Sequence, residues 1–150
     1  MGLPMYQARL WARRHSRFLE DVYNTVNPVI IATLRGVTKI FGDRLDGPIT
    51  AVEAAGKGFL FDCKMCGDCA LSRTGMSCPM NCPKTMRNGP CGGVRDNGHC
   101  EVKPEMRCVW VEAWDGAAQM KEGGTINDVE FAIDHRRIGT STWLRLARDG

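Results

Sequence analysis

Eight cysteines lie between Cys63 and Cys108, and this segment constrains the fold more than any other part of the chain. It is also rich in glycine and proline, and it shows neither the 3.6-residue period of a helix nor the two-residue period of a strand. A segment of this kind cannot bury an apolar core of its own. The sequence therefore predicts irregular loops that are held together by cysteine chemistry.

The spacing of the cysteines is typical of metal ligands. Cys63, Cys66 and Cys69 follow one another at steps of three, so that their thiolates can face one centre. The other five are Cys78, Cys82, Cys91, Cys100 and Cys108. Proline follows both Cys78 and Cys82, as it follows cysteine in bacterial ferredoxins. Eight thiolates make two sets of four, as two [4Fe–4S] clusters require, so all eight are candidate ligands.

Three other interpretations of the cysteines remain open. Zinc accepts four thiolates, and Cys63 and Cys66, with two residues between them, would supply one pair of ligands. Against zinc, Cys69 is then an extra cysteine beside this pair, and the sequence lacks a second, separate Cys-x2-Cys pair to complete the site. A mixed site with one cluster and one zinc ion also satisfies the count. Disulfides are disfavoured because the N-terminus lacks the apolar stretch of a secretory signal, which predicts a cytoplasmic, reducing location.

Residues near the cysteines suit a metal centre. The loop at residues 88–93 has little side-chain bulk, so its backbone N–H groups can donate to cluster sulfurs. Trp110 and Trp114 either pack in the core or shield a cluster from water. His99 adjoins Cys100 and could replace a thiolate as a ligand. In the simpler interpretation His99 has a surface or packing role.

Helical signals flank the cysteine segment. Residues 6–23 have apolar side chains at three- and four-residue steps, which predicts a helix whose aromatic face packs on its own domain or docks a partner. Asn27-Pro28 predicts a second helix start, and residues 46–48 predict a turn. Thr50 to Glu53 matches a capping box, so a short helix is expected to end at Gly56.

The C-terminal third is less regular. Residues 108–114 are β-branched and aromatic, which favours a strand, and residues 138–146 favour a short final helix or arm. The expected fold class is mainly α, with irregular, metal-organised Cys-rich loops and little sheet. The predicted division is an N-terminal helical segment, a Cys-rich metal-binding domain, and a linker with a C-terminal arm, at residues 1–60, 61–114 and 115–150.

Charge and hydropathy exclude two classes of partner. The net charge is only +3, and no basic-aromatic platform accompanies the arginines near the two ends, so nucleic-acid binding is not predicted. No apolar run approaches the roughly 20 residues that a membrane-spanning helix needs.

Three strings resemble the methylenetetrahydrofolate reductase C-terminal domain family, which includes the MetV-type small subunit. They are Cys-Lys-Met-Cys-Gly-Asp-Cys at 63–69, Cys-Pro-Met-Asn-Cys-Pro-Lys-Thr-Met-Arg-Asn-Gly-Pro-Cys-Gly-Gly at 78–93, and Gly-His-Cys-Glu-Val-Lys-Pro at 98–104. The resemblance covers about residues 60–114.

The resemblance implies an iron–sulfur accessory subunit that is not catalytic alone. All eight cysteines would be cluster ligands, and the ferredoxin analogy suggests Cys82 as the fourth ligand beside Cys63, Cys66 and Cys69. Flavin and folate would bind a MetF-type partner subunit, which reduces 5,10-methylene-tetrahydrofolate to the 5-methyl form or runs the reverse reaction. The alternative is a structural zinc module that docks and stabilises the flavin-bearing subunit without a redox role.

Overall fold

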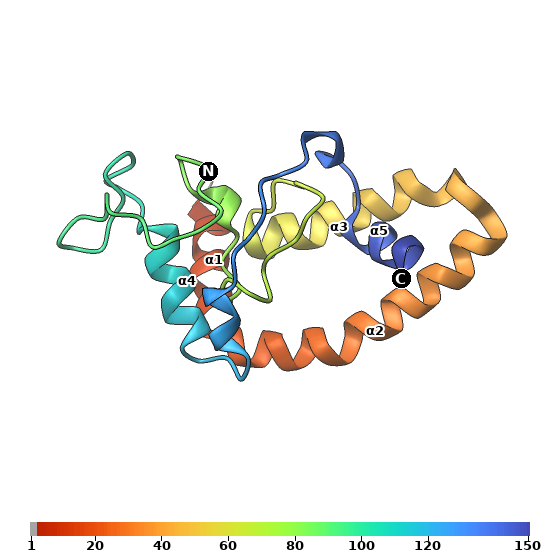
Figure 1. The fold of residues 1–150 in the computed structure, drawn as a ribbon, viewed down its shortest axis with the longest axis horizontal. Coiled ribbons are helices and arrows are strands. Elements are labelled where there is room, and N and C mark those ends of the chain that lie inside the picture. The colour runs from red at the N-terminus through yellow and green to blue at the C-terminus, as the bar shows by residue number, and fades with distance from the viewer. Residues whose placement is uncertain (1–2) are drawn as a thin grey trace.

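The structure, a computed structural model, describes residues 3–150 and is mainly helical (Figure 1). Five α-helices form within these residues: α1 (Leu3–Arg14), α2 (Ser16–Phe41), α3 (Asp46–Phe61), α4 (Val109–Ala117) and α5 (Thr142–Asp149). Short 3₁₀ turns lie at Gly42–Leu45, Pro79–Asn81, Gly123–Asn127 and His135–Arg137. Residues 1–2, at the start of the predicted helical segment, lie outside the described chain. Pairing between extended segments within residues 3–150 amounts to two isolated bridges, Val94 with Cys100 and His99 with Arg107. The prediction of a mainly helical chain with little sheet is confirmed.

The predicted helix over residues 6–23 is confirmed, with a break at His15. The backbone of His15 leaves helical geometry (φ −110°, ψ 27°), and α2 then turns away from α1. The predicted helix start at Pro28 is wrong, because α2 passes through this residue without interruption. Pro28 has no N–H to offer the carbonyl of Asn24. Asn24 is exposed, so water can satisfy that carbonyl.

Helix α3 overturns two further expectations. The predicted turn at residues 46–48 is the first helical turn, where the missing N–H of Pro48 would have no intrahelical acceptor in any case. The predicted capping box lies in the middle of the helix, which continues through Gly56 to Phe61. The helix stops at Asp62, whose backbone is left-handed (φ 51°).

The predicted strand over residues 108–114 is also wrong, because these residues begin helix α4. Val109, Trp110, Ala113 and Ala117 are all buried, and their spacing places them along one side of a helix. Burial of this side against the cysteine loops and α1 outweighs the strand preference of β-branched and aromatic residues. The predicted C-terminal helix is confirmed as α5, which starts four residues later than expected.

Buried carboxylates join helices that are distant in sequence. Glu20 of α2 accepts hydrogen bonds from the backbone N–H groups of Lys121 and Glu122, at 2.7 and 3.0 Å. Glu53 of α3 is only 1% exposed and accepts hydrogen bonds from Lys57 (2.5 Å) and from Ser141 at the start of α5. The Glu20 contacts tie α2 to the segment that follows α4, and the Glu53 contact with Ser141 ties α3 to the start of α5. In Figure 1, α1 lies beside α3 and α4, and α5 lies between α2 and α3.

The predicted linker begins at residue 115, but residues 115–117 end helix α4. The chain that follows returns along the molecule and contacts the cysteine loops through Glu130. Nothing in the structure tests the predicted division into three domains, so it stays a prediction. No helix in the described part of the chain is long and apolar enough to cross a bilayer.

Gly75 provides a test of the packing between the cysteine loops and α4. Its φ is +60°, and a Cβ atom there would lie 2.2 Å from the carbonyl oxygen of Ala113. We expect Gly75→Ala to lower the free energy of unfolding by about 2 kcal/mol or more, through backbone strain and overpacking. Chemical denaturation measures the effect. The matched control is Gly58→Ala in α3, where a Cβ meets nothing within 4 Å and a gain of about 0.5–1 kcal/mol is expected. Equal effects at the two positions would contradict this packing.

Candidate metal centre

The loop that carries the first three cysteines is shaped by left-handed backbone positions. Asp62, Met65 and Gly67 have φ values of 51°, 49° and 74°. Gly67 is required here, because a Cβ atom would lie 2.4 Å from the carbonyl oxygen of Arg137. The resulting turns bring the short steps between the cysteines back toward one cavity.

Four cysteines line this cavity. Cys63, Cys66 and Cys69 face it together with Cys78, which follows on the next loop. The cavity is small, about 20 Å³. The ferredoxin analogy suggested Cys82 as the fourth member, but Cys82 does not line the cavity and packs elsewhere. The chain turns at Pro79–Asn81 between Cys78 and Cys82, which directs the two thiols into different surroundings.

Burial opposes ionisation of two thiols of this group, those of Cys63 and Cys78. Burial, together with the neighbouring Cys63, raises the pKa of Cys78 to about 12. Burial also raises the pKa of Cys63, although its sulfur accepts a hydrogen bond from the backbone N–H of Met65 at 3.3 Å. A cation held in this cavity would offset the cost of ionising Cys63 and Cys78.

The remaining four cysteines lie together in the loops between residues 82 and 108. Cys82 and Cys100 are buried in one apolar cluster, and Cys108 is buried in the adjoining one, against which Cys91 packs. Met86 contacts both clusters. Cys82, Cys91, Cys100 and Cys108, named the second group, are thus divided between two apolar clusters that Met86 connects.

Lys84 places a positive charge beside the second group. Its ammonium lies 3.9 Å from the sulfur of Cys91. Its hydrogen bond to Glu101 raises the pKa of Lys84, and the nearby Cys91 and Cys100 act in the same direction. The sulfur of Cys91 also accepts a hydrogen bond from the N–H of Gly93 at 3.4 Å. This contact is of the kind predicted for the loop at residues 88–93.

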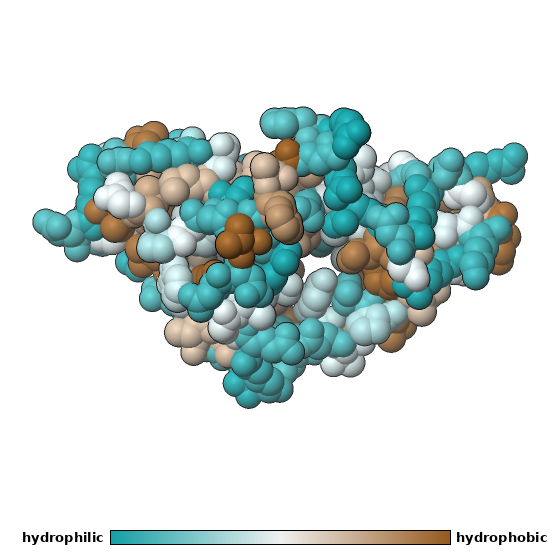
Figure 2. Space-filling view, in the orientation of Figure 1, coloured by the Kyte–Doolittle hydropathy of each residue, from teal (hydrophilic) through white to brown (hydrophobic). Residues whose placement is uncertain are grey.

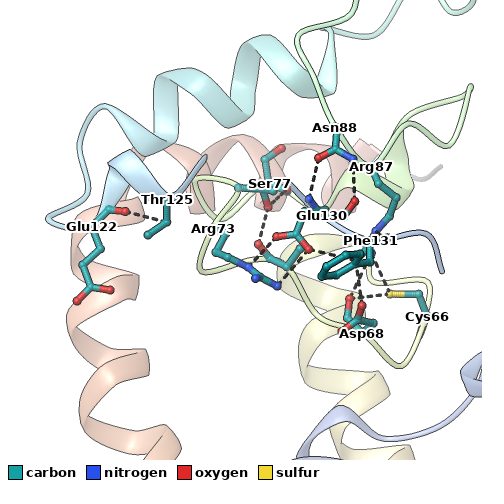
Figure 3. A network of polar contacts seen from close by, with 12 residues as sticks. Cys66, Asp68, Arg73, Ser77, Arg87, Asn88, Glu122, Thr125, Glu130 and Phe131 are labelled. Atoms are coloured by element: carbon teal, nitrogen blue, oxygen red, sulfur yellow. Dashed lines mark hydrogen bonds and ion pairs between the residues drawn. The ribbon is translucent and has the colours of Figure 1, made fainter. Parts of the chain in front are cut away.

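A buried arginine lies beside the first group (Figure 3). The side chain of Arg87 is only 7% exposed, and its guanidinium lies 4.0 Å from the sulfur of Cys66. It donates to the carboxylate of Asp68 at 3.2 Å and to that of Glu130 at 3.3 Å. Arg73 pairs with the same Glu130 at 2.7 Å. The network joins the first cysteine loop to the returning C-terminal segment.

Two further contacts hold the C-terminal segment against these loops. The side-chain amide of Asn88 donates to the backbone carbonyl of Glu130 and accepts from its N–H, both at 2.8 Å. Arg145 of α5 donates to the carbonyl of Gly67 at 3.1 Å and pairs with Asp68 at 3.2 Å. The first cysteine group is therefore enclosed by residues from four separate parts of the chain.

Sequence reasoning missed the charged residues that surround the cysteines. Lys57 and Arg87 lie beside the first group and Lys84 beside the second. Arg145 binds Gly67 and Asp68 in the loop of the first group. Burial lowers the pKa of Lys57, but Cys69 and Glu53 outweigh it, so the pKa is raised overall. A search for cations interleaved with the cysteines would have found Lys84 and Arg87.

The predicted neighbours of the cysteines have distinct positions. Trp110 is buried in the same apolar cluster as Cys108 and donates through its indole to the carbonyl of Met86 at 3.2 Å. Trp114 is more exposed. The ring of His99 lies 2.7 Å from the carbonyl oxygen of Pro104 and is at the surface.

The chemistry of the donor set fits a metal centre, although the side chains are not gathered as ligands of one ion. Across residues 3–150, no three side chains of Cys, His, Asp or Glu converge closely enough to hold a metal ion. All eight cysteines are free thiols, in two groups of four, with backbone N–H donors and cations beside them. These are the partners that sulfur-ligated clusters use.

Comparison with known proteins identifies the family. Residues 43–136, more than half of the chain, match the family described as methylene-tetrahydrofolate reductase C terminal. The chain belongs to this family. The family match includes all eight cysteines and Arg87, Asn88 and Glu130 of the polar network. No curated protein and no solved structure matches the chain.

Proposed function

We propose that this member of the methylene-tetrahydrofolate reductase C-terminal family is an iron–sulfur accessory subunit. The observation that carries the proposal is that Cys63, Cys66, Cys69 and Cys78 line one cavity, while the other four cysteines lie in two apolar clusters connected by Met86. Cys63, Cys66, Cys69 and Cys78 would hold one [4Fe–4S] cluster, and Cys82, Cys91, Cys100 and Cys108 the other. When bound, such clusters supply one-electron transfer.

The residues of the chain would set the properties of each centre. The cations of Lys57, Arg87 and Lys84 offset negative charge on the thiolates. The N–H groups of Met65 and Gly93 donate to sulfur, which favours the reduced state of a cluster. Trp110 and its apolar neighbours exclude water from Cys108.

The partner would be a flavin-bearing methylene-tetrahydrofolate reductase subunit, and the family assignment supports this choice. Flavin and folate would bind that subunit, where 5,10-methylene-tetrahydrofolate is reduced to the 5-methyl form or the reverse reaction runs. The hydride chemistry belongs to the flavin. This chain would pass electrons to or from it.

Rapid mixing of the two subunits tests the proposal. The chain is purified without oxygen, reduced with dithionite, freed of excess reductant and mixed with the oxidised flavin subunit. We expect the flavin absorbance to bleach while the visible absorbance of the clusters recovers. The control is the chain reconstituted with zinc, which has no electrons to give. A flavin that stays oxidised beside reduced clusters would contradict the proposal.

A native chain that holds zinc without sulfide would instead be a structural module that docks and stabilises the reductase.

A further inference from the structure

A second, larger cavity lies between α2 and α3. This apolar groove has a volume of about 260 Å³ and is open to solvent along one side. Its walls include Val22, Val26, Ile30, Leu60, Cys69 and Trp143. A single domain gains nothing by leaving an apolar hollow of this size open to water, so the groove has the character of a binding site.

The apolar groove shares a wall with the first cysteine group. Cys69, Leu71 and Lys57 line both the groove and the cysteine cavity. Anything seated in the groove therefore lies against one of the proposed cluster ligands. Electron transfer slows steeply as donor and acceptor move apart, so a redox partner must approach the chain close to its cysteines.

An exposed apolar stripe on α2 leads into the groove. It consists of Phe18, Val22, Val26 and Val29, which recur at three- and four-residue steps on one face of the helix. Val22 and Val26 belong to both the stripe and the groove wall. Figure 2 shows white and brown atoms mixed with teal ones along the lower right edge of the molecule, where the later part of α2 runs in Figure 1. Single exposed apolar residues are ordinary, whereas a row beside an apolar hollow is typical of a protein interface.

The charges around the groove restrict its occupant. Among its described lining residues Lys57 is the only cation, and no carboxylate is present. The Lys57 ammonium is bound by Glu53 at 2.5 Å and lies 5.1 Å from the ring centre of Trp143. The groove thus offers little to phosphate or to an acidic peptide. It suits an aromatic or aliphatic anchor from a protein surface.

We infer that the apolar groove and the α2 stripe are the docking site for the flavin-bearing reductase subunit. This inference rests on the proposed function, because the shared Cys69 wall is what selects a redox partner. An apolar side chain of the partner fills the groove, and the stripe packs against the surface around it. The partner then lies beside the first cysteine group and not beside the second.

Matched valine-to-glutamate variants test the docking site. Val26→Glu and Val29→Glu place a carboxylate in the stripe, at positions 44% and 64% exposed, so the isolated chain can keep the new charge in water. Val52→Glu is the control, because Val52 is 67% exposed on α3 and does not line the groove. Each full-length variant is purified anaerobically and titrated with the flavin subunit of the same organism, with iron, sulfide and oligomeric state measured in parallel.

We expect both stripe variants to keep wild-type iron, sulfide and melting temperature while their affinity for the flavin subunit falls about tenfold or more, with Val52→Glu unchanged. Wild-type affinity in both stripe variants would overturn the inference. A wild-type homodimer that the stripe variants dissociate, with flavin-subunit binding intact, would also overturn it, because the occupant would then be a second copy. If the chain holds zinc and the stripe variants still lose affinity for the flavin subunit, the docking site is supported and only the electron-transfer role is refuted.

Discussion

Replacement of Cys66 by serine is expected to remove about half of the iron and acid-labile sulfide, because Cys66 would be one of four ligands of one of two clusters. The melting temperature is expected to fall as well, since metal-binding free energy contributes to folding in loops that lack an apolar core. Cys91→Ser is expected to remove the other half. Lys64→Ser is the control, because Lys64 lies in the same loop with an exposed side chain.

The grouping of the cysteines gives this experiment a sharper form. The spectrum that remains in Cys78→Ser should match that of Cys66→Ser, and the spectrum of Cys82→Ser should match that of Cys91→Ser. Electron paramagnetic resonance of the reduced variants provides the comparison. If Cys82→Ser loses the same signal as Cys66→Ser, the ferredoxin analogy is right and the assignment of Cys78 to the first group is wrong. Full metal content in Cys66→Ser would remove Cys66 from the ligands.

Arg87→Gln is expected to lower the free energy of unfolding by about 3 kcal/mol. The buried guanidinium is the link between Asp68 and Glu130, and its loss leaves the nearly buried Glu130 with Arg73 as its remaining cation. Arg73→Gln is the matched control, because its side chain is 42% exposed and its ion pair should contribute about 1 kcal/mol or less. Anaerobic chemical denaturation measures both variants.

Arg87→Gln has a second readout that a purely structural role would not move. Removal of a positive charge 4.0 Å from the sulfur of Cys66 should disfavour the reduced state of one cluster. The midpoint potential of one centre should therefore fall while the other stays constant. Equal losses of stability in the two arginine variants, with both potentials unchanged, would contradict the role given to the Arg87 network.

The helical part of the fold could be predicted from the sequence where the apolar period was clear, as at residues 6–23. The boundaries could not, because burial decided them against local signals. Pro28 is typical of a helix start and Gly56 of a helix end, yet α2 continues through Pro28 and α3 continues through Gly56. Val109 and Trp110 favour a strand locally, but their burial against the cysteine loops makes a helix the better structure.

The candidate ligands could all be named from the sequence, because cysteine spacing is local information. Their grouping could not, since it depends on the turn at Pro79–Asn81 that separates Cys78 from Cys82. The surrounding charges were missed for the same reason. Glu130 and Arg145 are far from the cysteines in sequence and contact Arg87 and Gly67 of the cysteine loops only because the C-terminal segment returns along these loops.

The most direct test of the central claim is metal and sulfide analysis of the anaerobically purified chain, with electron paramagnetic resonance after reduction. The account predicts about eight iron and eight acid-labile sulfide per chain and signals from two [4Fe–4S] clusters. Stoichiometric zinc without sulfide, in a colourless protein, would contradict it. The cysteines would then remain metal ligands, and the chain would be a structural subunit of the reductase.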